Sequence, residues 1–218
     1  MSPRWLWPKK ESAYYVRMSS PKPDFVMPVE YLALERKSEI RSEYIAGHIY
    51  AMSGASRRHN LIAGNLFGLL WTQMRGRGCE AYMSDMRLKV SPTGMYTYPD
   101  IVAVCDEPRF EDAHIDTLLN PLVIVEVLSE STEAYDRGEK FAHYRRLGTL
   151  REYVLVAQDK IRVEHYVRKG EQWILSEISD SDGTLHLASV DCHVMLAAIY
   201  EKVEFLPETN GVSTSAST

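Results

Sequence analysis

The sequence predicts one α/β domain, built on a single mixed sheet with helices on both faces. Residues 122–131, LVIVEVLSES, carry apolar side chains at odd and even positions alike, which is typical of a strand buried on both faces. Segments with helical spacing of apolar residues alternate with such strands along the chain. This alternation indicates an α/β architecture.

The composition sets broad limits on what the protein is. The chain has 218 residues, 45% of them hydrophobic, which suffices for one substantial core. Its 25 Lys and Arg against 30 Asp and Glu argue against a uniformly basic nucleic-acid binder, although a local basic groove stays compatible. No run approaches the roughly 18 apolar residues of a membrane span, and no signal peptide opens the chain. We expect a cytoplasmic protein without membrane contact.

The cysteines support that location. Cys79, Cys105 and Cys192 are odd in number and far apart, and they match no zinc spacing or disulfide framework. We therefore expect buried free thiols, as in a reducing compartment.

Three regions follow from composition along the chain. Residues 1–23 are rich in Pro, Ser and Lys and form an N-terminal extension, in which Met18 is an alternative start to Met1. Residues 24–207 form the folded domain. Residues 208–218 are small and polar, which is typical of a disordered tail.

The first half of the domain begins with a short helix over residues 27–38, with Pro28 in its first turn. A hairpin over residues 41–53 follows, turning at Ala46–Gly47, and then a long helix over residues 57–78. Two strands close this half, at residues 79–90 and 96–105, joined by the turn-forming sequence SPTG.

The second half starts with the doubly buried strand at residues 122–131. A loop and a helix follow, ending at Gly148, and then a strand over residues 152–157. Residues 160–178 alternate on either side of Lys169–Gly170, which predicts a second hairpin. A closing helix is expected over residues 193–203.

Glu126 is the feature that points to chemistry, because a carboxylate inside a buried strand is costly unless it has a partner. Asp136, Lys140 and Tyr144 follow at i, i+4 and i+8, so they share one stripe of the next helix. A helix packed over the sheet can bring Lys140 to Glu126 and lower the cost of ionising it.

Asp100 supplies a second acid, at the start of the strand that follows Pro99. Two carboxylates on neighbouring strands repel unless a cation lies between them. Mg²⁺ is such a cation, since it binds one or two carboxylates together with water and phosphate oxygens. This set of residues suits metal-assisted hydrolysis of a phosphodiester.

The combination of Pro99–Asp100, VEVLS at 125–129, DRGEK at 136–140 and EYVLV at 152–156 resembles the Uma-two family. These are bacterial putative endonucleases of the restriction-endonuclease-like, or PD-(D/E)XK, superfamily. The resemblance implies Asp100 and Glu126 as catalytic acids and ligands of Mg²⁺ or Mn²⁺. Leu128 stands where the superfamily has its lysine. The resemblance assigns that role to Lys140, on the following helix.

The same resemblance adds auxiliary residues. It matches Glu43 to an acid before a Gly-containing turn and His59 to a histidine at the start of the long helix. Asp136 is better explained as the N-cap of its helix, and a direct role for it is the lesser alternative. Tyr144 is expected to pack against the sheet.

We therefore predict a Mg²⁺-dependent DNA endonuclease, with Arg57, Arg58 and Lys89 as weak candidates for contacts to the phosphate backbone. The resemblance also implies a homodimer. One alternative is a nuclease-fold module that binds nucleic acid or a partner but has lost hydrolysis. The presence of Leu128 in place of the superfamily's lysine favours this alternative. Another alternative is a metal-independent acid pair of the glycosidase type, but the sequence shows no cluster of residues for stacking against a sugar.

Overall fold

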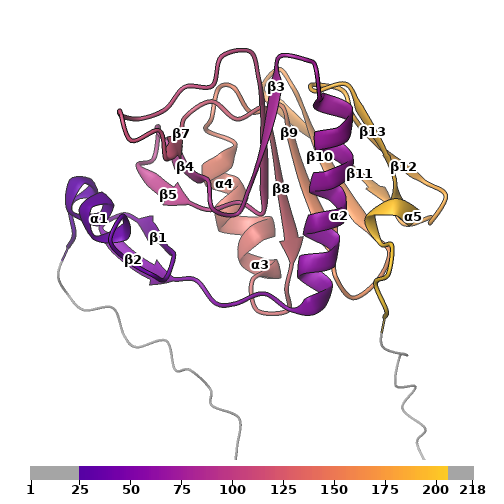
Figure 1. The fold of residues 1–218 in the computed structure, drawn as a ribbon, viewed down its shortest axis with the longest axis horizontal. Helices are drawn as coiled ribbons and strands as arrows, with labels where there is room; N and C mark the ends of the chain where they lie inside the picture. The colour runs from indigo at the N-terminus through magenta and orange to yellow at the C-terminus, as the bar shows by residue number, and fades with distance from the viewer. Residues whose placement is uncertain (1–24, 206–218) are drawn as a thin grey trace, which may run out of the picture.

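The computed structural model describes residues 25–205 and is centred on a six-stranded mixed sheet (Figure 1). β8 and β9 run parallel in this sheet, and the other neighbours are antiparallel. Across the sheet the order is β11 (Gln172–Ile178), β10 (Val163–Lys169), β9 (Glu152–Ala157), β8 (Val123–Leu128), β6 (Ile101–Cys105) and β3 (Cys79–Met83). The predicted extension 1–23 and tail 208–218 lie outside the described residues.

Two smaller sheets accompany the central one, where the sequence analysis expected a single sheet. A five-stranded sheet has the order β2 (His48–Ala51), β1 (Ser42–Ile45), β5 (Met95–Thr97), β4 (Arg87–Val90) and β7 (Thr117–Leu118). A two-stranded sheet pairs β12 (Thr184–Leu187) with β13 (Cys192–Met195). The α/β class is confirmed, and the expectation of a single sheet was wrong.

Helices cover both faces of the central sheet, as predicted (Figure 1). The alternating side chains of β8 show which helix covers which face. Val123, Val125 and Val127 pack in one core with α2 (Arg57–Met74) and α5 (Leu196–Ile199). Ile124 and Leu128 pack in a second core with α4 (Phe141–Tyr144) and the five-stranded sheet. Glu126 shares the face of Ile124 and Leu128, and therefore points toward the side of α4.

Several predicted elements are confirmed. The first helix is α1 (Pro28–Glu35), with Pro28 in its first turn. The hairpin at Ala46–Gly47 is β1–β2, whose turn needs the positive φ of Gly47. α2 begins after the N-cap Ser56, whose side chain accepts a hydrogen bond from the His59 amide. The strand 152–157 and the second hairpin are β9 and β10–β11.

Two predicted strands are each divided. Residues 79–90 form β3 and β4 with a turn between them, and residues 96–105 form β5 and β6 with a break at residues 98–100. Pro99 lies in that break, where it has no amide hydrogen to give to a ladder. Each half joins a different sheet, so the break carries the chain from one sheet to the other.

The predicted closing helix was wrong over its first turn. Residues 193–195 belong to β13, where Val194 is buried and its neighbours are exposed. Pairing with β12 buries this face against α2, and only the short α5 follows. The period of two in this segment was the signal that the sequence analysis missed.

The expectation of three free thiols was also wrong. Cys79 on β3 and Cys105 on β6 are direct partners in the strand register and form a disulfide, while Cys192 is free and buried. This pairing depends on the register of two strands that are 26 residues apart in sequence. Residue spacing alone gave no sign of that register.

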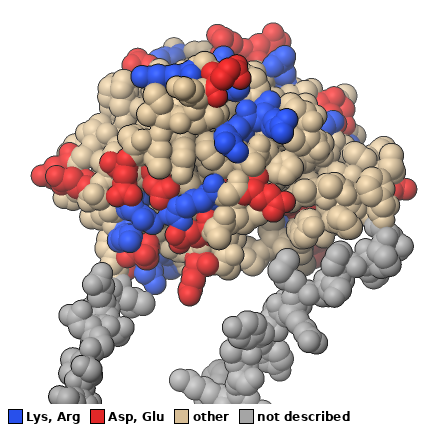
Figure 2. All heavy atoms as spheres, turned by 180° about the vertical axis from the view of Figure 1, so that it is seen from behind, with Lys and Arg blue, Asp and Glu red and all other residues tan. Residues whose placement is uncertain are grey.

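The surface carries charges of both signs, and Figure 2 shows basic and acidic side chains interspersed over the rear face. Among the helices of residues 25–205, not one combines the length and the apolar character that crossing a membrane requires.

The disulfide gives a direct prediction. Thiol titration of the denatured protein, prepared without reductant, should find one thiol per chain, from Cys192. The same titration after reduction should find three. Three thiols before reduction would contradict the link between β3 and β6.

Candidate active site

The site is built around Lys140, which lies in a wide helical turn after β8. The helix begins with α3 (Glu133–Tyr135), passes through the π-helical turn η1 (Asp136–Lys140) and continues as α4. Such single π turns are frequent at functional sites. Asp136, Lys140 and Tyr144 are all buried, so the predicted stripe faces the sheet.

Three carboxyl groups surround the Lys140 ammonium. Its Nζ lies 3.0 Å from Glu126 Oε1 and 3.1 Å from Glu43 Oε1, and 3.7 Å from Asp136 Oδ1. Lys140 and the three acids are all buried, each with less than a tenth of its surface exposed. Glu126 comes from β8 of the central sheet and Glu43 from β1 of the five-stranded sheet. The lysine therefore joins acids from both sheets.

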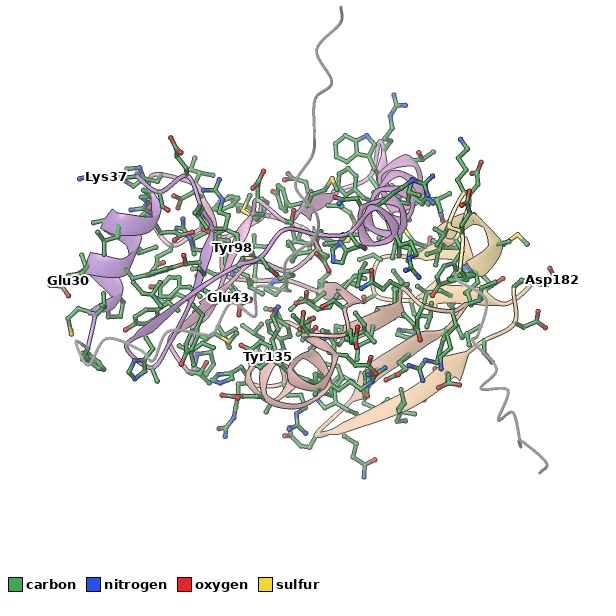
Figure 3. All side chains as sticks on the ribbon, turned by 90° about the horizontal axis from the view of Figure 1, so that it is seen from below. Glu30, Lys37, Glu43, Tyr98, Tyr135 and Asp182 are labelled. Atoms are coloured by element: carbon green, nitrogen blue, oxygen red, sulfur yellow. A yellow bond between two sulfur atoms is a disulfide. The ribbon has the colours of Figure 1, made fainter. Side chains whose placement is uncertain are left out.

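Hydroxyl groups fix the two glutamates. The Tyr144 hydroxyl donates to Glu126 Oε1 at 2.8 Å, and the Thr97 hydroxyl donates to Glu43 Oε1. The Tyr135 hydroxyl donates to Glu43 Oε2 at 3.3 Å, and Figure 3 shows Glu43 and Tyr135 close together. Tyr144 was expected only to pack against the sheet. Its place on the stripe of Asp136 and Lys140 was the signal that it also reaches the acids.

Asp100 lies beside this cluster, at the start of β6. Ile101 pairs with Val125, so Asp100 stands at the register position opposite Glu126. Its Oδ2 accepts a hydrogen bond from the Val127 amide at 2.7 Å and lies 3.1 Å from His59 Nε2. His59 comes from the first turn of α2, so the predicted histidine lies in contact with the predicted acid.

Burial and mutual repulsion set the protonation of the acids. Burial raises the pKa of Glu126 to about 8, with the Lys140 charge opposing this and the Asp136 and Asp100 charges adding to it. Burial also raises the pKa of Asp136. Without a further cation, Glu126 is therefore largely protonated at neutral pH.

For Lys140 and His59, the charges of neighbouring acids outweigh the effect of burial on the pKa. Burial disfavours the Lys140 charge, but Glu126, Glu43 and Asp136 outweigh burial and raise the pKa of Lys140 well above its ordinary value. Burial likewise disfavours protonated His59, and the hydrogen bond and charge of Asp100 outweigh it, so the pKa of His59 is raised. Both shifts favour the cationic form of the group.

The expected N-cap role of Asp136 was wrong. The helix begins three residues earlier, with Thr132 as the N-cap residue, because the Glu133 amide donates to the Ser129 carbonyl at 2.9 Å. Asp136 is left inside the π turn, buried next to Lys140. Leu128, which stands where the superfamily has its lysine, is buried in the apolar core.

The residues predicted to contact nucleic acid lie in two places. Arg57 and Arg58 open α2, next to His59, and Arg57 is exposed. Lys89 lies on β4 and pairs with Glu111. It lines a cavity of about 400 Å³ beside α1, so the structure gives it a separate environment from the acids.

The donor set suits a hard divalent cation. Glu43, Asp100, Glu126 and Asp136 bring four carboxyl groups against one lysine and one histidine. Within residues 25–205, no group of three or more His, Cys, Asp or Glu side chains is placed so that it could hold a metal ion. Mg²⁺ needs fewer protein ligands, since water and substrate oxygens complete its shell. The carboxyl groups of Asp100 and Glu126 are of the chemical type that Mg²⁺ and Mn²⁺ bind.

Comparison with known proteins gives three kinds of similarity. Residues 28–197 match the model of the Uma2 family, described as "Putative restriction endonuclease". The protein sll1609 of Synechocystis sp. (strain PCC 6803) is 38% identical over 160 residues, covering 73% of this chain and 90% of the relative. The protein slr1290 of the same organism is 35% identical over 188 residues, covering 86% and 97%.

A solved structure has the same fold. It is described as "a putative nuclease belonging to DUF820" from Anabaena variabilis, and it aligns with a TM-score of 0.67 at 19% identity. The alignment covers 82% of this chain and 99% of the other. The restriction-endonuclease-like fold expected from the sequence is thus confirmed.

Removing the central cation should destabilise the fold. Lys140→Met leaves Glu126 and Glu43 buried without their partner, so we expect a loss of about 3 to 5 kcal/mol in the free energy of unfolding. Urea denaturation above the pKa of Glu126 measures it. Lys160→Met, at an exposed position, is the matched control and should change little. Equal stability of the two variants would contradict the central role of Lys140.

The raised pKa of Glu126 predicts a pH dependence of stability. Between pH 4.5 and about 8 the folded protein holds a proton on Glu126 that the unfolded chain releases. Stability should therefore fall as pH rises through this range, with a contribution of about 1.4 kcal/mol per pH unit. Urea denaturation in EDTA should show a shallower fall for Glu126→Gln than for wild type. Identical slopes would contradict the raised pKa.

Proposed function

Because the chain belongs to the Uma2 family, we propose that it is a metal-dependent endonuclease that hydrolyses phosphodiester bonds in DNA. The observation that carries this proposal is the placement of the three residues that the resemblance assigns to catalysis: Lys140 contacts Glu126, and Asp100 lies at the register position opposite Glu126. The similar fold of a structure described as "a putative nuclease" supports the same function. A homodimer and a cytoplasmic location remain part of the proposal, although the Cys79–Cys105 disulfide is not what a reducing compartment favours.

Asp100 and Glu126 would hold the Mg²⁺ or Mn²⁺ ion. Bound there, the cation would supply positive charge for a phosphate oxygen and lower the pKa of a water molecule. The Val127 amide and His59 both contact Oδ2 of Asp100, so that carboxylate is fixed before substrate arrives. The Tyr144 hydroxyl does the same for Glu126. Preorganised groups of this kind cost no rearrangement during the reaction.

Lys140 serves as a fixed positive charge. Its raised pKa keeps the ammonium protonated, so it does not accept a proton from water. Glu43 and Asp136 hold the ammonium on the side of Glu126. A positive charge in this place would stabilise the negative charge that develops on the phosphate. Glu43 is then a positioning residue that acts through Lys140.

The competing function is a module with the same fold that binds nucleic acid or a partner without hydrolysis. The burial of Lys140 among three carboxyl groups favours this alternative, because ion pairs alone can explain such a cluster. Hydrolysis and metal dependence separate the two functions.

Plasmid cleavage tests the proposal. Wild type should nick supercoiled plasmid with Mg²⁺ and lose this activity in EDTA. Asp100→Asn and Lys140→Met should each lower the rate by at least about a hundredfold, because each removes a charge needed in the transition state. Glu139→Gln, on the same helix at an exposed position, is the control and should keep the activity. Cleavage by Asp100→Asn at the wild-type rate would contradict the proposal.

A further inference from the structure

A cluster of five basic residues lies beyond the C-terminal end of α4 and is used by none of the contacts described above. Arg145 and Arg146 directly follow α4, Arg151 precedes β9, and Arg168 and Lys169 end β10. We call these five residues the basic patch.

The charges of the basic patch are not neutralised within the structure. No member of the patch forms an ion pair with a carboxylate of residues 25–205. The whole chain has a net charge of −5, so this local excess is not a consequence of composition. Unpaired cations close together repel each other unless an anion is bound between them.

Backbone carbonyls hold two of the guanidinium groups in place. Arg168 Nη1 donates to the Leu147 carbonyl at 2.7 Å, and Arg151 Nη1 donates to the Gly148 carbonyl at 2.9 Å. Each guanidinium has five N–H donors in a planar fork, so several donors remain for a ligand. Positioned arginines of this kind suit phosphate oxygens, which accept paired hydrogen bonds.

There is room for such a ligand between them. Arg151 and Arg168 line a pocket of about 380 Å³, together with Gly148, Gly170 and Glu171. The two glycines face open space, with no other atom within 4 Å of where a Cβ would stand. Glu171 is the one acidic residue among the lining residues. The pocket is therefore open, polar and predominantly positive.

We propose that the basic patch binds backbone phosphates of the nucleic acid whose scissile bond lies at Asp100 and Glu126. This inference rests on the proposed function and adds a second contact region to it. Arg146 follows Lys140 by six residues, which corresponds to about 9 Å along a helix axis. A distance of that size corresponds to about three nucleotides of one strand at 3.4 Å each, which is within the length of one duplex.

Binding of a labelled duplex tests the proposal without requiring cleavage. A duplex of about 20 base pairs is titrated in EDTA and followed by fluorescence anisotropy over a range of salt. The patch variant is Arg146→Gln/Arg151→Gln/Lys169→Gln. The control variant, Lys37→Gln/Arg75→Gln/Lys160→Gln, changes three exposed cations elsewhere and has the same net charge. Circular dichroism confirms that both variants are folded.

The patch variant should bind the duplex at least about tenfold more weakly at about 100 mM salt, and the dependence of log K on log salt should fall by about 2 to 3. The control should stay within about twofold of wild type. Equal weakening of the two variants, or no weakening of the patch variant, would overturn the proposal. Tight binding of inorganic phosphate to the patch, with duplex binding unchanged by the substitutions, would also overturn it and indicate a small anion.

This experiment is separate from the test of hydrolysis. If wild type cleaves no DNA but the patch variant loses duplex binding, the basic patch is supported and the nuclease proposal fails. If cleavage depends on Asp100 while the patch substitutions leave duplex binding unchanged, the nuclease proposal is supported and the basic-patch proposal fails.

Discussion

The contact of the Lys140 ammonium with buried carboxyl groups is the interaction on which the arrangement of the molecule depends. Glu43 comes from the five-stranded sheet, Glu126 from the central sheet, and Asp136 from the helix that carries the lysine itself. Each acid alone would be costly to bury. Together with Lys140 they bring two sheets and one helix to the same point. The fold therefore places acids where a hydrolytic site needs them, and the same acids need a cation to stay charged.

The break between β5 and β6 contributes to the site as well as to the fold. It moves the chain from one sheet to the other, and it leaves Asp100 opposite Glu126 with its carboxylate on the Val127 amide. Thr97, just before the break, bonds Glu43. The four residues from Thr97 to Asp100 thus supply groups next to both Glu43 and Glu126. A continuous strand over this region would lose this arrangement, because it would keep the chain in one sheet.

The parts of the site that could be predicted from the sequence are those set by local periodicity. Glu126 stands out because it interrupts an apolar strand, and Lys140 shares a helical stripe with Asp136 and Tyr144, at a spacing of four residues. The disulfide and the division of the strands depend on register between distant segments, which periodicity does not encode. The burial of Asp136 was missed for a local reason, since Thr132 and Ser129 start the helix one turn earlier than the aspartate suggests.

The central claim is that the acids of this cluster hold a divalent cation, and anomalous diffraction from crystals soaked in Mn²⁺ tests it most directly. The account predicts a Mn²⁺ peak within coordination distance of both Asp100 and Glu126, with Lys140 still against Glu126. Asp100→Asn crystals treated in the same way should show no peak. Wild-type crystals with no Mn²⁺ at these carboxylates, or with the ion bound only elsewhere, would contradict the account.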